Sequence, residues 1–109
     1  MSFSILRPLY PSPTRSGNSL VAGQLTTATS TAAVALVGTA LNGGTHMCMF
    51  DIQGGNVWCT VDGQTPSSTK GHLLSVGQAY TWSAGMMNAA KVIATTTTNA
   101  TIWISELQD

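Results

Sequence analysis

Short segments of alternating apolar and polar residues, separated by turn signals, constrain the fold of this chain more than any other feature. Residues 46–53 alternate, with Cys48, Phe50 and Ile52 on one face. Because successive side chains of a strand point to opposite faces, this period of two predicts a half-buried strand. Similar segments recur about every 8–12 residues from Leu20 onward, without a convincing amphipathic helix. The sequence therefore predicts an all-β fold, a β-sandwich or jelly-roll-like domain of about seven to eight strands.

The clearest pairing signal is a hairpin over residues 46–62. Gly54-Gly55-Asn56 supplies its turn, since glycine adopts positive φ readily, and residues 57–62 alternate again. Further strands are predicted over 20–27, 72–76, 79–83, 90–95 and 100–107, and over 31–37 with a helical turn as the alternative, whereas 85–88 is interpreted as a loop. The residues expected to point inward are Cys48, Phe50, Ile52, Val57, Cys59, Val61, Ile102 and Ile104.

The first nineteen residues differ in composition from the rest of the chain. Pro8, Pro11 and Pro13 each remove a backbone donor and disfavour helix. We therefore divide the chain into an extended arm, residues 1–19, and a β-sandwich domain, residues 20–109. The arm is too apolar for an idle tail, so it either contacts a partner or docks on its own domain. Its candidate partner-interface residues are Phe3, Ile5, Leu6, Leu9 and Tyr10.

Charge is scarce in this chain. Four Lys plus Arg and four Asp plus Glu make up 7% of the 109 residues and cancel to a net charge of zero, whereas soluble domains are typically about 25% charged. A surface of Thr, Ser, Asn, Gln and Gly repels a neighbour little, which favours assembly and a homo-oligomer. The four basic residues are too few and too scattered to neutralise nucleic-acid phosphates. No apolar run approaches the roughly 20 residues of a membrane helix, and no export signal is recognised, so a cytosolic origin is expected.

The sequence indicates no active site. No nucleophile elbow, phosphate loop or dinucleotide-binding glycine pattern occurs, and His46 and His72 stand alone at strand edges. Cys48 and Cys59 fall on apolar faces and are interpreted as core thiols, with a metal or redox pair as the alternative. We therefore expect no enzyme, no catalytic residue, no cofactor and no metal. The three tryptophans fit either packing anchors or an exposed sugar-binding platform; they are Trp58, Trp82 and Trp103.

One segment carries a family resemblance. Residues 57–74, VWCTVDGQTPSSTKGHLL, combine a strand, a "DG-x-TP" turn and a "G-x-x-L" strand. This segment resembles small β-sandwich proteins of tailed-bacteriophage virions, which often serve as capsid cement, decoration or other minor head components. The resemblance implies a non-enzymatic virion protein, made in the bacterial cytoplasm, whose partners are the major capsid protein or other virion proteins. A head–tail or tail component is an alternative. The same turn also resembles immunoglobulin-like domains appended to chitin-degrading enzymes, which leaves a carbohydrate-binding module open.

Overall fold

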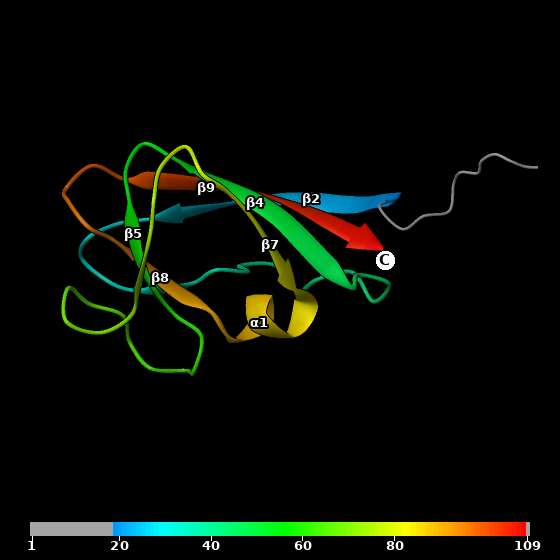
Figure 1. The fold of residues 1–109 in the computed structure, drawn as a ribbon, viewed down its shortest axis with the longest axis horizontal. Helices are drawn as coiled ribbons and strands as arrows, with labels where there is room; N and C mark the ends of the chain where they lie inside the picture. The colour runs from blue at the N-terminus through cyan, green and yellow to red at the C-terminus, as the bar shows by residue number, and fades with distance from the viewer. Residues whose placement is uncertain (1–18, 109) are drawn as a thin grey trace, which may run out of the picture.

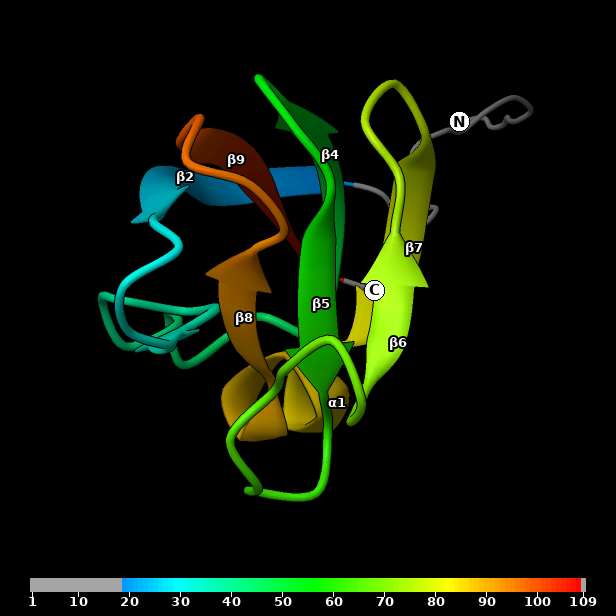
Figure 2. The ribbon, with the colours of Figure 1, turned by 90° about the vertical axis from the view of Figure 1, so that its left-hand side faces the viewer.

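The computed structural model describes residues 19–108, which form two antiparallel four-stranded sheets packed face to face (Figures 1 and 2). The first sheet has the order β2 (Ser19–Ala28), β9 (Ala100–Gln108), β4 (Met47–Gln53), β7 (Ala79–Ser83). The second has the order β3 (Val34–Ala35), β8 (Lys91–Ala94), β5 (Val57–Thr60), β6 (His72–Leu74). The predicted β-sandwich and its number of strands are confirmed.

The core lies between the two sheets and is built from the inward residues of both. β9 alternates between buried and more exposed positions along its length, as the period of two predicted. The ring of Phe50 stacks on Tyr80 at 5.3 Å and meets Trp82 edge-on at 5.0 Å, which fills the space beneath β4 and β7. Of the eight residues expected inside, Val61 is half-buried at the rim, and seven are at most 1% exposed: Cys48, Phe50, Ile52, Val57, Cys59, Ile102 and Ile104.

The hairpin predicted over residues 46–62 is wrong in its pairing, although both of its strands exist. β4 pairs with β7 and β9, whereas β5 pairs with β6 and β8. The glycine turn therefore carries the chain from one sheet to the other. Gly54 has a φ of 90°, and a Cβ there would lie 2.5 Å from the carbonyl oxygen of Asn99. Alternation shows which face of a strand is buried but not which strand lies beside it, so it cannot separate a hairpin from a crossing between sheets.

A short helix stands where the sequence predicted a loop over residues 85–88. This helix, α1 (Ala84–Ala89), connects β7 with β8 and lies below β7 in Figure 1. The Ser83 hydroxyl caps it by accepting a hydrogen bond from the amide of Met86 at 3.3 Å, and Met87 is fully buried. Six residues are too few to display a helical period of 3.6, which explains why the pattern was missed.

The segment 31–37 forms only the two-residue strand β3, followed by the buried Leu36. The Leu36 amide donates to the carbonyl of Ala90 at 3.0 Å, and its own carbonyl accepts from the Thr26 hydroxyl at 2.7 Å. These bonds tie the segment to both sheets without a longer ladder.

The arm, predicted over residues 1–19, lies outside the described residues up to position 18, and Ser19 already opens β2. Its candidate interface residues, Phe3, Ile5, Leu6, Leu9 and Tyr10, are therefore not described by the structure. Over residues 19–108, no helix has the length and apolar character needed to cross a membrane.

Candidate interaction surface

The first sheet exposes large apolar side chains on the face turned away from the second sheet. We call this group the outer strip and define it by Leu25 of β2, Trp103 of β9 and Met49 of β4, which are 55%, 53% and 48% exposed. Leu25 lies directly opposite Trp103, and Met49 lies one row away, opposite Ser105. Directly opposed side chains of antiparallel strands are close neighbours, and a diagonal neighbour such as Met49 is still within reach of a large aromatic ring, so the strip spans three strands.

Trp103 has a glycine of β2 on one side and a pocket on the other. On one side, a Cβ built on Gly23 would lie 3.6 Å from the indole Cζ2 atom, an ordinary contact distance, so the ring lies directly beside the backbone of β2. On the other side is a shallow pocket of about 170 Å³, smaller than the roughly 300–1,000 Å³ of small-molecule sites. This pocket suits a protein side chain better than a cofactor. Its lining residues are Met49, Phe50, Asp51, Ala79, Trp103 and Ser105.

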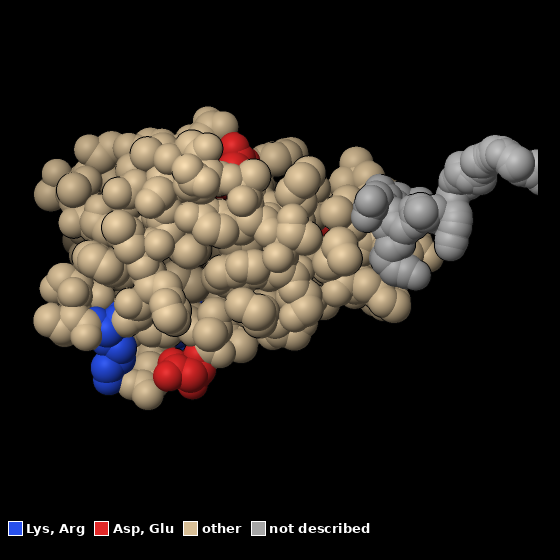
Figure 3. Space-filling view, viewed as in Figure 1, with Lys and Arg blue, Asp and Glu red and all other residues tan. Residues whose placement is uncertain are grey.

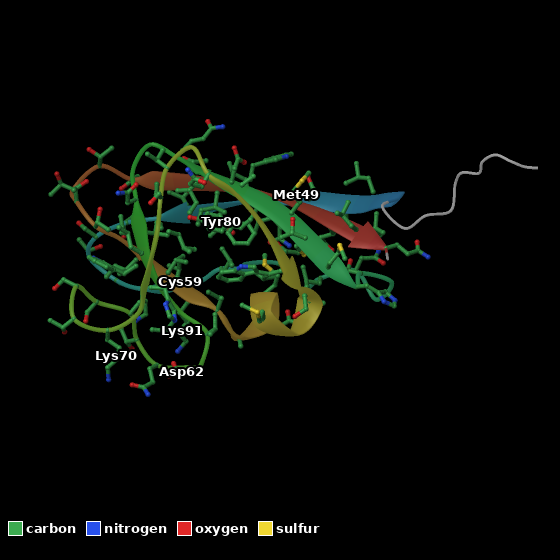
Figure 4. The ribbon with its side chains drawn as sticks, viewed as in Figure 1. Met49, Cys59, Asp62, Lys70, Tyr80 and Lys91 are labelled. Atoms are coloured by element: carbon green, nitrogen blue, oxygen red, sulfur yellow. The ribbon has the colours of Figure 1, made fainter. Side chains whose placement is uncertain are left out.

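The outer face of the first sheet is almost uncharged. Among the described residues of its four strands, Asp51 is the single charged side chain on that face. Figure 4 places Met49 well away from Lys70, Asp62 and Lys91, which gather on the side of the second sheet. In the view of Figure 3, most of the surface carries neither a basic nor an acidic residue. The outer strip therefore offers apolar contact with few charges to remove from water.

The second sheet has a similar but more buried row. Trp58 of β5 lies opposite Leu73 of β6 and Ile93 of β8. Leu73 is 47% exposed, whereas Trp58 and Ile93 are half-buried. The tryptophans thus divide by position: Trp82 packs against the core, Trp58 lies in this second row, and Trp103 is exposed on the outer strip.

Glu106 is a buried carboxylate that the sequence reasoning did not single out. It points between the sheets from β9 and is 3% exposed. Its Oε1 accepts from the Asn42 amide at 2.7 Å and from the Thr45 hydroxyl at 3.0 Å, and its Oε2 accepts from Gln24 Nε2 at 3.2 Å. Burial raises the pKa of Glu106, but the bonds from Asn42, Gln24 and Thr45 together hold it below the ordinary value of 4.5.

The Glu106 network has a structural role. Gln24 also exchanges two hydrogen bonds with the backbone of Thr39, at 2.9 and 3.1 Å. The network thereby fastens the loop between β3 and β4 to β2 and β9. All of the donors to Glu106 are neutral and each is committed to this loop, so the carboxylate acts as an anchor rather than as an acid or base.

A pocket beside β5 borders the first residue of the "DG-x-TP" turn, Asp62. Asp62 accepts from the Gln64 amide at 3.1 Å, and Lys70 Nζ donates to the Gln64 side chain at 2.6 Å. Gly63 takes a φ of 83°, and Pro66 is buried. These contacts join the turn to itself and to the loop that follows it, and they account for the motif as local structure. The pocket is lined by Thr60, Val61, Asp62, Lys70, Gly71 and His72.

The cysteines and histidines occupy the positions that the sequence predicted. Cys48 and Cys59 are free thiols on different sheets, and both are fully buried. Burial raises the pKa of Cys59 to about 11, and burial together with the nearby Glu106 charge raises that of Cys48. Both histidines are exposed: His46 directly precedes β4, and His72 is the first residue of β6. Over residues 19–108, no three His, Cys, Asp or Glu side chains are grouped so that they could hold a metal ion.

Comparisons with known proteins add little to this picture. No family model and no curated protein matches the chain. A dTDP-4-dehydrorhamnose 3,5-epimerase from Bacillus anthracis, crystallised with TDP and pyrophosphate, is similar at 15% identity and a TM-score of 0.33 over 84% of this chain. The chain spans about half of that enzyme, 54% of its length. A likeness this weak says nothing about what the chain binds or does, and the two-sheet architecture rests on the strand pairing itself.

Proposed function

We propose that this chain is a non-enzymatic structural component of a bacteriophage particle, with capsid cement or decoration as its role. One observation carries the proposal: the outer face of the first sheet exposes Leu25, Met49 and Trp103 and bears Asp51 as its single described charge. Contiguous apolar surface on a soluble protein marks interaction sites. The chain attaches to the major capsid protein or to other virion proteins through such contacts.

The scarcity of charge supports an assembly role on physical grounds. Removing charges from water is what makes many interfaces costly, and this face has little charge to remove. Its remaining outward positions include Thr81, Thr101 and Thr27, whose hydroxyls and methyl groups suit a contact surface. Many copies on one particle add their contacts through multivalency, so each contact can be modest.

The turn at residues 62–66 gives a second, weaker support. Its tight geometry, with positive φ at Gly63 and a buried Pro66, fits the "DG-x-TP" turn that resembles small virion β-sandwich proteins. A turn shared with these proteins supports a similar fold more strongly than a similar function. The role therefore depends on the outer face, and the turn is consistent with it.

Cosedimentation with phage heads tests this proposal. Heads prepared without the protein are mixed with increasing amounts of the purified full chain and pelleted, and the pellets are then heated to measure head stability. We expect saturable binding at a fixed ratio to the major capsid protein and a higher temperature of head disruption. Binding only to tails supports the head–tail or tail alternative. Absence from heads and tails alike overturns the proposal.

A carbohydrate-binding module is the second candidate, because the exposed Trp103 ring has the polar groups of Asp51 and Ser105 beside it. Aromatic rings with adjacent polar side chains are suited to stacking on sugars. Affinity electrophoresis in polysaccharide gels separates the two functions. Retardation of the full chain that disappears in Trp103→Thr favours the module, whereas unchanged migration in all gels favours assembly.

A further inference from the structure

We infer that the outer strip is the seat for the N-terminal segment, residues 1–18, of a second copy of this chain. The inference rests on the proposed assembly role and deepens it by naming the surface and its occupant. The seat consists of Leu25, Met49 and Trp103 with the adjoining pocket.

The N-terminal segment matches the seat in character. It supplies apolar side chains and prolines, and apolar Pro-rich segments bind to exposed grooves that contain aromatic residues. The pocket beside Trp103 is large enough for a side chain of this kind. The apolar residues of the segment are Phe3, Ile5, Leu6, Leu9 and Tyr10.

The charges of the segment and of the outer face are also complementary. Arg7 stands in the middle of the apolar run of the segment, which contains no acidic residue. Asp51 is the single described charge on the outer face of the sheet and lies directly opposite Trp103. Within residues 19–108, its carboxylate accepts a single hydrogen bond, a long one of 3.5 Å from Gln53 Nε2. The Asp51 carboxylate is thus placed to pair with Arg7 while the apolar residues around Arg7 cover the strip.

The segment is long enough to reach a second copy. β2 begins at Ser19, at the end of the sheet where it lies opposite Gln108, and has ten residues. Ten strand residues span about 33 Å. Leu6 and Phe3 precede Ser19 by 13 and 16 positions, which correspond to about 40 and 50 Å in the extended conformation that prolines favour. In that conformation Phe3 and Leu6 would lie farther from Ser19 than β2 is long, so they could reach the sheet of a second copy.

Photo-crosslinking of the full chain tests the seat and the source of the segment together. Phe3 is replaced by p-benzoylphenylalanine, the purified protein is irradiated over a range of concentrations, and the products are resolved by denaturing electrophoresis and mass spectrometry. We expect a product of twice the chain mass, cross-linked to the regions around Met49 or Trp103. A cross-link within one chain, a link to another surface, or no product of double mass overturns the inference.

A charge exchange gives an independent test. Arg7→Glu and Asp51→Arg are each expected to weaken self-association, measured by light scattering, whereas the double variant that carries both is expected to restore it. Restoration is a readout that misfolding or a general loss of apolar contact does not produce. Failure of the double variant to recover contradicts the Arg7–Asp51 pair and the seat that includes it.

A matched pair of leucine variants tests the choice of face. Leu25→Thr and Leu73→Thr remove similarly exposed side chains from strands of the first and second sheets. Loss of a central contact residue commonly weakens binding about tenfold or more, so Leu25→Thr is expected to raise the dissociation constant of self-association by that factor. Leu73→Thr is expected to leave it unchanged, and an equal effect of both contradicts the assignment. These measurements use purified protein without phage heads, so their failure is separable from that of head binding.

Discussion

At the scale of single residues, Glu106 couples stability to pH. Its folded-state pKa is held below 4.5 by hydrogen bonds, chiefly from Asn42. A lowered folded-state pKa contributes stability that is fully present above the unfolded-state pKa and is lost as pH falls through the folded-state value. Glu106→Gln places a second donor against Gln24 Nε2 or Asn42, and an unsatisfied buried donor costs about 1–3 kcal/mol.

We therefore expect Glu106→Gln to lower the free energy of unfolding at neutral pH by about 1–3 kcal/mol. The difference from the unmodified chain is expected to shrink as pH falls below 4.5, because the Glu106 carboxyl of the unfolded chain then takes up a proton before that of the folded chain does. Urea denaturation at a series of pH values measures both effects. Asp51→Asn, on the outer face, is the control and is expected to change stability by less than about 0.5 kcal/mol. Curves that stay parallel down to acid pH contradict the role assigned to Glu106.

Position 54 requires glycine because the chain crosses from one sheet to the other there. Its positive φ disfavours any residue with a Cβ, and that Cβ would lie 2.5 Å from the carbonyl oxygen of Asn99. Gly54→Ala is therefore expected to lower the unfolding free energy by more than about 1 kcal/mol. Gly55→Ala is the matched control, because its Cβ would lie 3.8 Å from the nearest atom, the carbonyl oxygen of Thr98. Equal thermal midpoints for the two variants contradict this account.

At the scale of elements, α1 closes one side of the core through a single side chain. Met87 is 0% exposed, whereas Met86 on the same helix is 40% exposed. Truncating a buried methionine to alanine typically costs about 2–5 kcal/mol. We expect Met87→Ala to destabilise the domain by this amount and Met86→Ala by less than about 0.5 kcal/mol, as measured by chemical denaturation. Similar losses for both variants argue that the helix packs differently.

The same elements show what the sequence can and cannot predict. Side-chain alternation located β4, β7 and β9 and identified apolar inward residues of β4 and β9, because a period of two follows directly from strand geometry. Pairing depends on contacts distant in sequence, so β5 was assigned to the wrong neighbour. Helix α1 was too short for its pattern to appear.

The candidate surface was predictable only in part. The sequence placed Trp103 on the face opposite Ile102 and Ile104 but left open whether it was core, interface or platform. Its neighbours became known only with the register, which sets Leu25 of β2 beside it although 78 positions separate them. The Glu106 network has the same origin, since its partners come from β2 and from the loop before β4, both far from Glu106 in sequence.

At the scale of the whole molecule, the scarcity of charge predicts how assembly responds to salt. The contacts proposed here are apolar apart from the pair of Arg7 with Asp51, and a single exposed ion pair contributes about 0–1 kcal/mol. Between about 0.1 M and about 1 M salt the Debye length falls from about 10 Å to about 3 Å, which screens such a pair but leaves apolar burial intact. Attachment to particles and self-association should therefore persist across this range.

Release of the protein from purified particles and light scattering of the purified protein, both over the same salt series, measure the two expectations. We expect the dissociation constant of self-association to rise by less than about tenfold, since about 1.4 kcal/mol corresponds to a factor of ten. The comparison is Asp51→Asn, which removes the carboxylate that pairs with Arg7. The self-association of this variant is expected not to weaken as salt rises. Complete release at moderate salt from particles that stay intact means that charge drives attachment, and the outer strip then does not account for assembly.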